Sequence, residues 1–329
     1  MAASSDHGLS QRGVESKTPV RDDLQEFFTA WSDPYHPSDN TAGYLVLLVA
    51  ENKLSWEVLK RKIESGSHGR RLEDWVAGYG DFRGEERFRR ALGRMMEDSF
   101  VKVPVDKDSL MVQAGCGAIL DSLAWCLGEE GDSCICPAPL YPAFANDFWA
   151  RARIHLHAAQ TFHPDYALTE QVLDKAFDEC LAAGKPARML LLCNPCNPLG
   201  TVYDEQTMRM CLEWVDKKGI HLISDEIYAN SIFPGETFTS VAKVAREMYP
   251  QRGDAYLGSN VHLTYGFSKD WAVSGMRAGV LMSHNKDLIA AASNLSCFMA
   301  MSSYTQWVWT GILEDSGMHA EAALIESPV

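Results

Sequence analysis

The sequence lacks any hydrophobic run long enough to cross a lipid bilayer. Its longest apolar segment, residues 44–50, has only seven residues, whereas a membrane-spanning helix needs about 20. The N-terminal stretch MAASSDHGLSQRGVESK has no apolar core and no cleavage pattern, so it is not typical of a secretory signal. These absences predict a protein without a membrane partner and with a cytoplasmic location.

Cysteine is too scarce for a disulfide scaffold. The chain has nine cysteines among 329 residues, an odd number that leaves at least one thiol unpaired, and most of them lie in apolar stretches. This usage is typical of reduced core residues in a reducing compartment. Cys193 and Cys196 form one CxxC, but a zinc ribbon needs a second CxxC. His155 and His157 alternate along an expected strand with no third ligand nearby, so we expect no metal site.

Positive charge is in the minority. The sequence has 30 Lys and Arg residues against 44 Asp and Glu residues, which gives a formal net charge of −14. Such a surface repels the phosphates of nucleic acid, so we expect no nucleic-acid partner. A small phosphorylated ligand in a local pocket remains compatible with this charge. A nicotinamide-dinucleotide enzyme is not indicated, because no G-x-G-x-x-G motif follows a first strand.

Apolar runs of strand length alternate with helical patterns from about residue 110 onward. Such alternation predicts right-handed crossovers and a mostly parallel sheet sandwiched by helices, which is an α/β fold. Helical periodicity is expected over residues 85–100, 169–183 and 205–218, whereas residues 1–40 are polar and show none. The expected strands are Leu110–Gln113, Ser133–Cys136, Ile154–His157, Met189–Cys193, His221–Ser224, Val261–Tyr265 and Gly279–Met282.

Two loops at expected strand ends have unusual composition, and ligands collect at the carboxyl ends of strands in a parallel sheet. The small-residue turn AGCGA (residues 114–118) precedes a helix, whose N-terminus favours a phosphate, although tight packing alone also explains such a turn. The segment NPCNPLGT (residues 194–201) is either a rigid turn or a loop that directs an Asn amide into the crevice.

Two further strand ends carry ionisable residues. Asp225 follows a buried strand, and a buried carboxylate needs either a helix N-terminus or a cationic ligand atom beside it. Lys269 follows another strand, where a lysine is usually solvated but can also have a lowered pKa and act as an imine-forming amine or a base. The combination of both residues with Tyr228, Asn197 and Arg277 at neighbouring strand ends favours a catalytic site.

This ordered set of motifs resembles the aminotransferase class I/II family of pyridoxal-phosphate (PLP) enzymes, and most of all its 1-aminocyclopropane-1-carboxylate (ACC) synthase branch. The likeness runs from about Gly43 to Met282 and implies PLP-transferase fold type I with an incomplete small domain. Its most specific parts are the Asp-x-x-Tyr step at 225 and 228 and the spacing from Lys269 to Arg277. The motifs are VAENKLSWEVL, GYGDFRGEERFRRAL, AGCGAILDSL, GDSCICPAPLYPAF, NPCNPLGT, SDEIY and FSKDWAVSGMRAG.

The resemblance assigns catalytic and ring-binding roles by position. Lys269 would form the internal aldimine with PLP and then transfer protons. Asp225 would pair with the pyridine nitrogen and keep it protonated, which makes the ring an electron sink. Tyr228 and Asn197 would hydrogen-bond the phenolic oxygen of the ring, and Tyr141 would stack on the ring face.

The resemblance also assigns residues to the phosphate, the partner subunit and the substrate. Arg277 would hold the phosphate together with Cys116, Gly117 and Ser268. Tyr79 would reach the phosphate of a neighbouring subunit, so the resemblance implies a homodimer. Glu51 matches an acidic residue that the ACC synthase branch uses near the sulfonium of the substrate; an ordinary surface acid is the equally weighted alternative.

Two positions depart from the family pattern. Gly266 stands three residues before Lys269, where the family often has a Ser or Thr that binds the phosphate, and Gly117 stands where a hydroxyl residue is common. Two lost hydroxyls would weaken phosphate binding by about 1 kcal/mol each. Thr264 and Ser268 are the candidates to compensate.

The resemblance predicts three parts of the chain. Residues 1–60 form an arm and part of the small domain, residues 61–310 form the large PLP-binding domain, and residues 311–329 form a tail in place of the C-terminal small domain. The family places an arginine for the substrate carboxylate in that domain, but Arg277 is the last arginine of this sequence. We therefore expect a C-terminally truncated chain with weak or absent turnover.

Two classes of function follow from the resemblance. One is a PLP-dependent enzyme that acts on an α-amino acid, either as an aminotransferase or as an ACC-synthase-like lyase, with C–S lyases among similar proteins. Both routes begin at the same carbanion, so the cofactor residues do not discriminate between them. The alternative is a truncated, catalytically impaired PLP-binding homologue with a regulatory or dimer-partner role.

Overall fold

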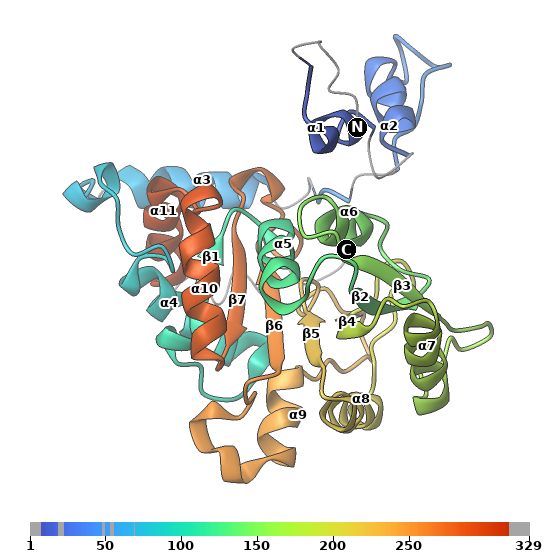
Figure 1. The fold of residues 1–329 in the computed structure, drawn as a ribbon. Coiled ribbons are helices and arrows are strands. Elements are labelled where there is room, and N and C mark those ends of the chain that lie inside the picture. Colours follow the sequence, from blue (N-terminus) through green and yellow to red (C-terminus); the bar gives the residue numbers. More distant parts are fainter. Residues whose placement is uncertain (1–7, 19–22, 48–49, 53–55, 69, 316–329) are drawn as a thin grey trace.

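A seven-stranded sheet forms the centre of the molecule in the computed structural model, which describes residues 8–18, 23–47, 50–52, 56–68 and 70–315. The strands lie side by side in the order β1-β7-β6-β5-β4-β2-β3 (Figure 1). Every expected strand is present, with its ends within three residues of the prediction. The strands are β1 (Leu110–Gln113), β2 (Ser133–Ala138), β3 (His155–Gln160), β4 (Ala187–Cys193), β5 (His221–Asp225), β6 (Val261–Gly266) and β7 (Gly279–Ser283).

Eleven α-helices and six shorter helical turns lie in the described part of the chain. None of these helices combines the length and the apolar character that a membrane span requires. The α-helices are α1 (Gln11–Glu15), α2 (Asp23–Ser32), α3 (Trp56–His68), α4 (Glu86–Met96), α5 (Cys116–Leu127), α6 (Ala143–Trp149), α7 (Glu170–Ala182), α8 (Glu205–Lys218), α9 (Val241–Met248), α10 (Lys286–Leu295) and α11 (Ser303–Leu313). The shorter turns are η1 (Asp74–Ala77), η2 (Glu97–Val101), η3 (Lys107–Ser109), η4 (Pro250–Ala255), η5 (Ser274–Met276) and η6 (Ser296–Phe298).

The sheet is mostly parallel, which confirms the predicted α/β fold. Strands β3, β2, β4, β5 and β6 run parallel, and β7 lies antiparallel between β6 and β1. Parallel neighbours need crossover connections, and helices α6 to α9 provide them between successive strands. The carboxyl ends of β4, β5 and β6 therefore meet at one edge of the sheet.

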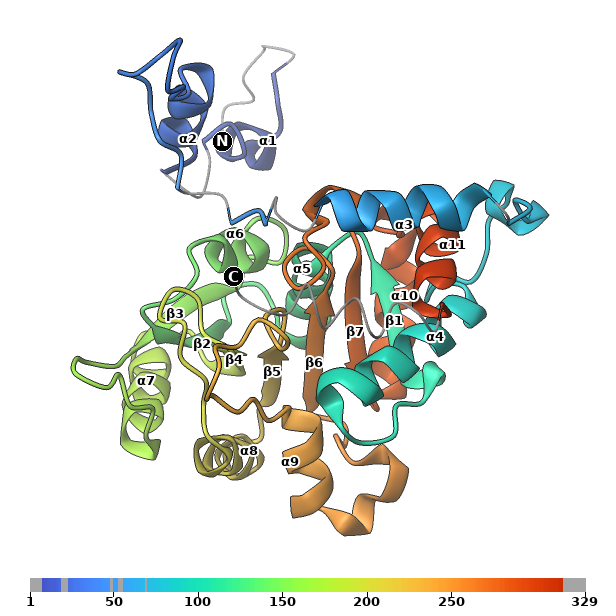
Figure 2. The ribbon, with the colours of Figure 1, turned by 180° about the vertical axis from the view of Figure 1, so that it is seen from behind.

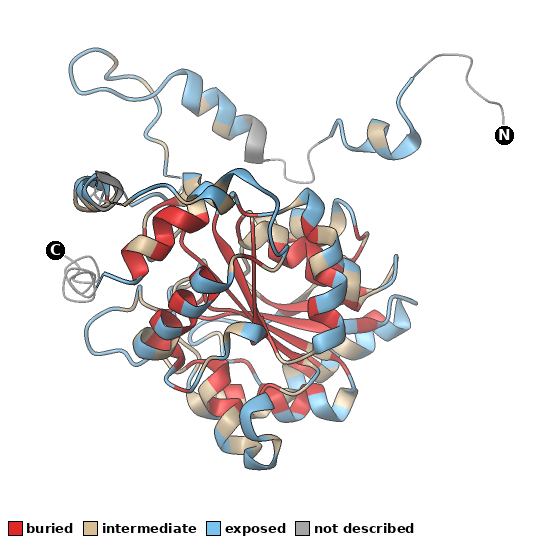
Figure 3. Ribbon diagram, turned by 90° about the vertical axis from the view of Figure 1, so that its left-hand side faces the viewer, coloured by how far each residue is buried: buried red, intermediate tan, exposed pale blue. Residues whose placement is uncertain are grey.

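Helices cover both faces of the sheet. Helices α5, α6 and α10 pack on one face, and α4, α7, α8, α9 and α11 pack on the other (Figures 1 and 2). Along β4, Leu190 and Leu192 point into the second layer, whereas Met189 and Leu191 point into the first. Figure 3 shows the strands buried between the two layers. Burial of both faces explains why these strands are nearly continuous apolar runs in the sequence.

Local capping explains where the predicted helices begin and end. Helix α8 has the predicted bounds because the Asp204 carboxylate accepts the Thr207 N–H at 2.7 Å and Gly219 ends the helix with a φ of 66°. Helix α4 begins at Glu86, after the N-cap residue Glu85, whose side chain accepts the Phe88 N–H at 2.7 Å. The helical pattern predicted over residues 85–100 continues beyond α4, but as the wider π-helical turn η2. This turn is followed by Lys102, which has a φ of 57°.

The N-terminal region differs from the prediction of an aperiodic segment. Residues 11–15 and 23–32 form helices α1 and α2, which lie outside the sheet and its two helical layers (Figures 1 and 2). In α2, Phe27 contacts both Phe28 and Trp31, with ring centroids 5.4 Å apart in each case. In the sequence, Leu24, Phe27, Phe28 and Trp31 follow the i, i+3, i+4, i+7 spacing of an amphipathic helix, so the signal for α2 was present. Helix α1 has only five residues, which are too few to show a period. Most of the tail predicted at residues 311–329 lies outside the described residues; α11 occupies its beginning.

Candidate active site

A cavity of about 290 Å³ opens at the carboxyl ends of β4, β5 and β6, beside the start of α5. The structure brings together here all the residues that the sequence predicts for the cofactor except Tyr79. These residues come from six separate segments of the chain, and they share one cleft. The lining consists of Cys116, Gly117, Leu120, Tyr141, Ala143, Phe144, Asp147, Cys193, Asn197, Asp225, Ile227, Tyr228, Ser268, Lys269, Ser274 and Arg277.

Lys269 lies three residues beyond β6 and projects its amine into this cavity. Its side chain is partly buried, and Nζ donates a hydrogen bond of 2.9 Å to the carbonyl oxygen of Ala50. Burial lowers the pKa of Lys269, because the charged form loses solvent, while the charge of Glu51 opposes this shift. A larger fraction of this amine is therefore neutral, and nucleophilic, than in an exposed lysine.

Asp225 ends β5 and is almost completely buried. Its Oδ1 accepts a hydrogen bond of 3.1 Å from the hydroxyl of Thr264. Burial raises the pKa of Asp225 to about 7, against the opposing effects of Thr264 and of the backbone at Ile227. Within the described ranges, no lysine, arginine or histidine forms an ion pair with this carboxylate. The site therefore holds a buried acid that a cationic ligand atom would stabilise.

Tyr228 and Asn197 meet at the wall of the cavity. The Nδ2 atom of Asn197 donates to the hydroxyl of Tyr228 over 3.4 Å. The loop that carries Asn197 is closed by hydrogen bonds from Cys196 N to Thr201 O at 2.8 Å and from Gly200 N to Cys196 O at 2.7 Å. Burial raises the pKa of Tyr228, so its hydroxyl stays protonated and remains a hydrogen-bond donor at neutral pH.

Arg277 is held against the start of α5. Its Nη1 donates to Ser274 O at 2.8 Å and its Nη2 to Ala114 O at 3.2 Å, while its own backbone adopts a φ of 51°. Gly115 makes this approach feasible, because a Cβ at that position would overlap the guanidinium and its φ is +100°. No side chain caps the N-terminus of α5. A guanidinium and the first turn of a helix thus lie together, which is a suitable arrangement for an anion.

The two glycines that depart from the family pattern have local explanations. A Cβ on Gly266 would lie 2.8 Å from Sγ of Cys116, whose thiol donates to Tyr265 O over 3.0 Å. A Cβ on Gly117 would lie 3.3 Å from Oδ1 of Asp147. Of the two candidates to compensate, Thr264 donates its hydroxyl to Asp225, whereas Ser268 lines the cavity, and the phosphate-binding role of Ser268 stays a prediction.

Tyr141 lies on the wall formed by the turn before α6. Its ring meets Phe144 edge to face, with centroids 5.3 Å apart. This contact fixes the tyrosine ring, which lines the cavity as a flat surface. The geometry suits stacking on a planar ligand, and the role of Tyr141 in binding one stays a prediction.

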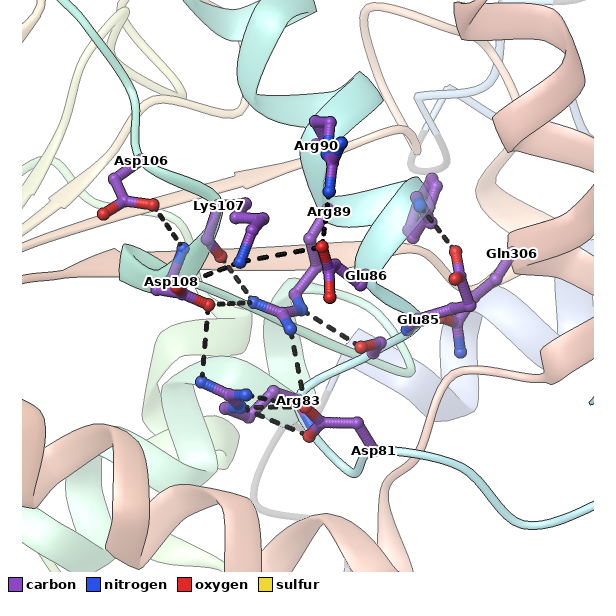
Figure 4. Close-up of polar contacts among 12 residues, drawn as sticks. Asp81, Arg83, Glu85, Glu86, Arg89, Arg90, Asp106, Lys107, Asp108 and Gln306 are labelled. Carbon is purple, nitrogen blue, oxygen red and sulfur yellow. Dashed lines mark hydrogen bonds and ion pairs between the residues drawn. The ribbon is translucent and has the colours of Figure 1, made fainter.

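Glu51 and Tyr79 lie outside the lining. Glu51 sits at the rim, where its Oε1 accepts a hydrogen bond of 3.1 Å from the hydroxyl of Ser274. Tyr79 is fully exposed. The loop after Tyr79 is anchored by the buried Arg89, which donates to Gly84 O at 3.0 Å and to Lys107 O at 2.6 Å (Figure 4). The predicted roles of Glu51 and Tyr79 are untested by this arrangement.

The residues considered as metal ligands have other contacts. Cys193 and Cys196 are buried, and burial raises the pKa of both thiols. His157 Nε2 lies 3.1 Å from Oε2 of Glu179. All nine cysteines are free, and the described part of the chain contains no group of three or more His, Cys, Asp or Glu side chains that could hold a metal ion.

Sequence reasoning missed the contact of Thr264 with Asp225 and the position of Asp147 in the cavity lining. Thr264 lies opposite Asp225 in the register of β5 and β6, a pairing that only the aligned strands reveal. Asp147 lines the cavity from α6, one turn after Phe144. Asp147 lies three residues after Phe144 and six after Tyr141, and this helical spacing could have indicated that it faces the same cavity.

Solved aminotransferase structures share this fold. The aspartate aminotransferase from Thermus thermophilus superposes with a TM-score of 0.76 at 19% identity, over 98% of this chain and 76% of that one. The aromatic aminotransferase from Pyrococcus horikoshii OT3 superposes with a TM-score of 0.67 at 19% identity, over 82% of this chain and 67% of that one. At this identity the likeness shows the fold alone, which is that of the fold type I aminotransferases.

The sequence itself shows the family. The model of the aminotransferase class I and II family matches residues 46–327, so the chain belongs to this family. ACC synthase 3 from Oryza sativa subsp. japonica is 32% identical over 308 residues, covering 89% of this chain and 68% of that protein. ACC synthase from Glycine max is 30% identical over 335 residues, covering 97% and 68%. ACC synthase 5 from Oryza sativa subsp. japonica is 32% identical over 310 residues, covering 90% of this chain and only 57% of that protein. The chain thus spans between 57% and 68% of the length of these three relatives.

Proposed function

We propose that this chain binds PLP in the cavity at the strand ends and acts on an α-amino acid, as an aminotransferase or as an ACC-synthase-like lyase. The observation that carries the proposal is that Lys269, Asp225 and Arg277 line one cavity of about 290 Å³. Membership of the aminotransferase class I and II family supports the same reading.

The residues present fit the three ends of PLP. Asp225, buried and without a cationic partner among the described residues, suits the protonated pyridine nitrogen. Arg277 and the uncapped start of α5 suit the phosphate. Lys269, with its lowered pKa, suits the aldehyde as an amine that is readily neutral.

PLP supplies an electron sink for negative charge at the α-carbon of an amino acid. The residues of this chain would hold the ring in place and transfer the proton. Asp225 would keep the ring nitrogen protonated, and Tyr228 with Asn197 would orient the ring by donating hydrogen bonds to its phenolic oxygen. Lys269 would take a proton from the α-carbon and return it, which requires the neutral amine that burial favours.

The proposal covers two routes that share these residues. Transamination returns the proton from Lys269 to the cofactor and releases a keto acid, whereas a lyase route expels a leaving group from the side chain. Glu51 lies at the rim within electrostatic reach of Lys269, and the curated relatives named above are ACC synthases. A carboxylate in this place suits a cationic, sulfur-bearing substrate and favours the second route.

We also propose a homodimer in which Tyr79 of one copy completes the site of the other. The full exposure of Tyr79 on a loop anchored by Arg89 supports this role, because the side chain is presented to the outside of its own subunit. The nine free cysteines support a reducing compartment such as the cytoplasm.

Absorbance spectroscopy tests the proposal. Addition of PLP should give a visible band that borohydride removes, and Lys269→Ala should abolish it. Lys175→Ala, which removes an exposed lysine of α7, should leave the band unchanged. Absence of the band in the unaltered protein would overturn the proposal.

Product analysis then separates the two routes. Pyridoxamine phosphate with a keto acid indicates transamination, and ACC, ammonia or a thiol indicates the lyase. A band without turnover of any amino acid would favour the impaired homologue.

A further inference from the structure

Asp147 places a carboxylate at the phosphate end of the proposed PLP cavity. It projects from α6 into the lining, opposite the first turn of α5. Its Oδ1 and Oδ2 lie 3.3 Å and 3.9 Å from the position that a Cβ would take on Gly117. The carboxylate therefore lies directly over the second residue of α5.

The start of α5 is also where the phosphate of PLP is expected. The helix is 12 residues long and begins at Cys116, after the N-cap residue Gly115, without a side-chain cap. Its first two residues, Cys116 and Gly117, line the cavity, and the first N–H groups of a helix have no partner within the helix. A carboxylate and a phosphate dianion beside the same helix turn repel each other, and the repulsion is strong where protein excludes water.

The charge of Asp147 affects the pKa values of two other groups that line the cavity. It contributes to raising the pKa of the Cys116 thiol and of the Asp225 carboxyl, after the larger effect of burial in each case. Two groups on different elements, α5 and β5, thus respond to this one carboxylate. A phosphate placed between them would respond as well.

Two cationic side chains line the cavity among the described residues. They are Arg277 and Lys269, and Lys269 is needed for the aldehyde. Neither Gly117 nor Gly266 supplies a hydroxyl, and a side chain at either position would press on Asp147 or on Cys116. Arg277 is therefore the arginine of the lining that is available to a phosphate.

We propose that Asp147 is the residue that determines how tightly this chain holds the phosphate of its cofactor, because it disfavours the dianion that Arg277 attracts. The inference rests on the proposed function for the identity of the cofactor. It requires no covalent step by Asp147. It predicts that one neutral substitution at Asp147 strengthens the binding of PLP.

The test compares Asp147→Asn with the unaltered protein and with Asp178→Asn. Asp178 is an exposed acid of α7 outside the cavity, so its substitution makes the same change in net charge. Three probes are titrated: PLP, pyridoxal (the same aldehyde without phosphate) and inorganic phosphate. The two aldehydes are followed by visible absorbance and inorganic phosphate by calorimetry.

Asp147→Asn should bind PLP and inorganic phosphate about tenfold more tightly, while pyridoxal affinity should stay within about twofold. Asp178→Asn should change none of the three. Unchanged or weaker PLP binding by Asp147→Asn would overturn the inference, and so would an equal gain for PLP and pyridoxal, because that result would place the effect at Asp225. Circular dichroism checks folding, and Asp147→Ser replaces the Asn variant if that variant does not fold.

Failure of the proposed function gives a different result. In that case neither aldehyde produces an absorbance band in any variant. The inorganic phosphate titration still decides the role of Asp147, because it does not depend on Lys269.

Discussion

The hydroxyl of Thr264 donates a hydrogen bond of 3.1 Å to Oδ1 of Asp225, across the parallel pair β5 and β6. Both residues are buried, and the pKa of Asp225 lies at about 7 chiefly because of that burial. The hydroxyl favours the ionised carboxylate, so it partly offsets the cost of removing this charge from water.

Thr264→Val should raise the pKa of Asp225 further, because the ionised form loses a donor while the shape of the side chain is kept. We expect the free energy of unfolding to fall by about 1–3 kcal/mol at pH 8, where Asp225 is mostly ionised, and by less at pH 5. Urea denaturation at the two pH values measures this difference. Thr264→Ser, which keeps the hydroxyl, should show no comparable pH dependence; an equal loss at both pH values in Thr264→Val would contradict the assignment.

Glu226 follows Asp225 but points to the opposite face, where its Oε1 accepts the Val241 N–H at the start of α9 over 2.8 Å. Burial raises its pKa to about 8, from an ordinary value of 4.5. Between these values the folded protein holds a proton that the unfolded chain has released, so this group makes stability decrease as pH rises from about 4.5 to 8.

Glu226→Gln removes that titration. The stability of this variant relative to the unaltered protein should therefore rise with pH by up to about 1.4 kcal/mol per pH unit from pH 4.5 to 8 and then level off. Chemical denaturation at pH 5, 6.5, 8 and 9 measures the trend. Glu213→Gln, at an exposed position of α8, should give a flat difference across the same range, and a flat difference for Glu226→Gln would refute the raised pKa.

Gly115 permits the guanidinium of Arg277 to reach the start of α5. Gly115→Ala should lower the free energy of unfolding by about 1–3 kcal/mol, because its φ of 100° and ψ of 164° belong to a region that other residues avoid. It should also weaken binding of inorganic phosphate, since a Cβ displaces Arg277.

Gly131 provides a matched control for Gly115. Its φ is +97° and a Cβ there would meet nothing within 4 Å. Gly131→Ala should lose stability without a change in phosphate affinity. Equal phosphate affinity in the two variants would show that Arg277 does not depend on Gly115.

Ala272 carries a φ of 56° in the segment between Lys269 and Arg277. Ala272→Gly should stabilise the protein by about 1 kcal/mol, because a left-handed backbone is costly for a residue with a Cβ. Thermal unfolding measures the gain. Ala290→Gly, at an exposed position inside α10, should instead lose about 1 kcal/mol; a loss at both sites would mean that Ala272 is not strained.

The strands and helices α4, α5, α7 and α8 were predictable because their signals are local. Buried strands are continuous apolar runs, and α8 starts and stops at an Asp and a Gly whose capping functions depend on the residues next to them. Helix α1 escaped prediction because five mostly polar residues cannot show a period. Helix α2 was predictable, because Leu24, Phe27, Phe28 and Trp31 have helical spacing, but the polar residues around it hid that signal. The π-helical turn after α4 escaped because apolar spacing does not distinguish it from α-helix.

The candidate site was predictable as a set of residues but not as an arrangement. Asp225 ends a strand, Lys269 follows one and Arg277 precedes one, so their meeting at one edge of the sheet was expected. The hydrogen bond from the Thr264 hydroxyl to Asp225 was not expected, because it depends on which side chains face each other across two strands. Asp147 was overlooked because its residue type is ordinary on a helix.

The order of strand-end residues along the chain, the family to which the chain belongs and the alternation of strands with helices were determined by the sequence alone. Tertiary structure decided which groups touch: Thr264 with Asp225, Gly115 with Arg277, and Asp147 with the first turn of α5. The reason is that spacing along a chain sets the face on which a side chain lies, whereas contact between elements depends on strand register and helix packing. The charge within the cavity follows from those contacts.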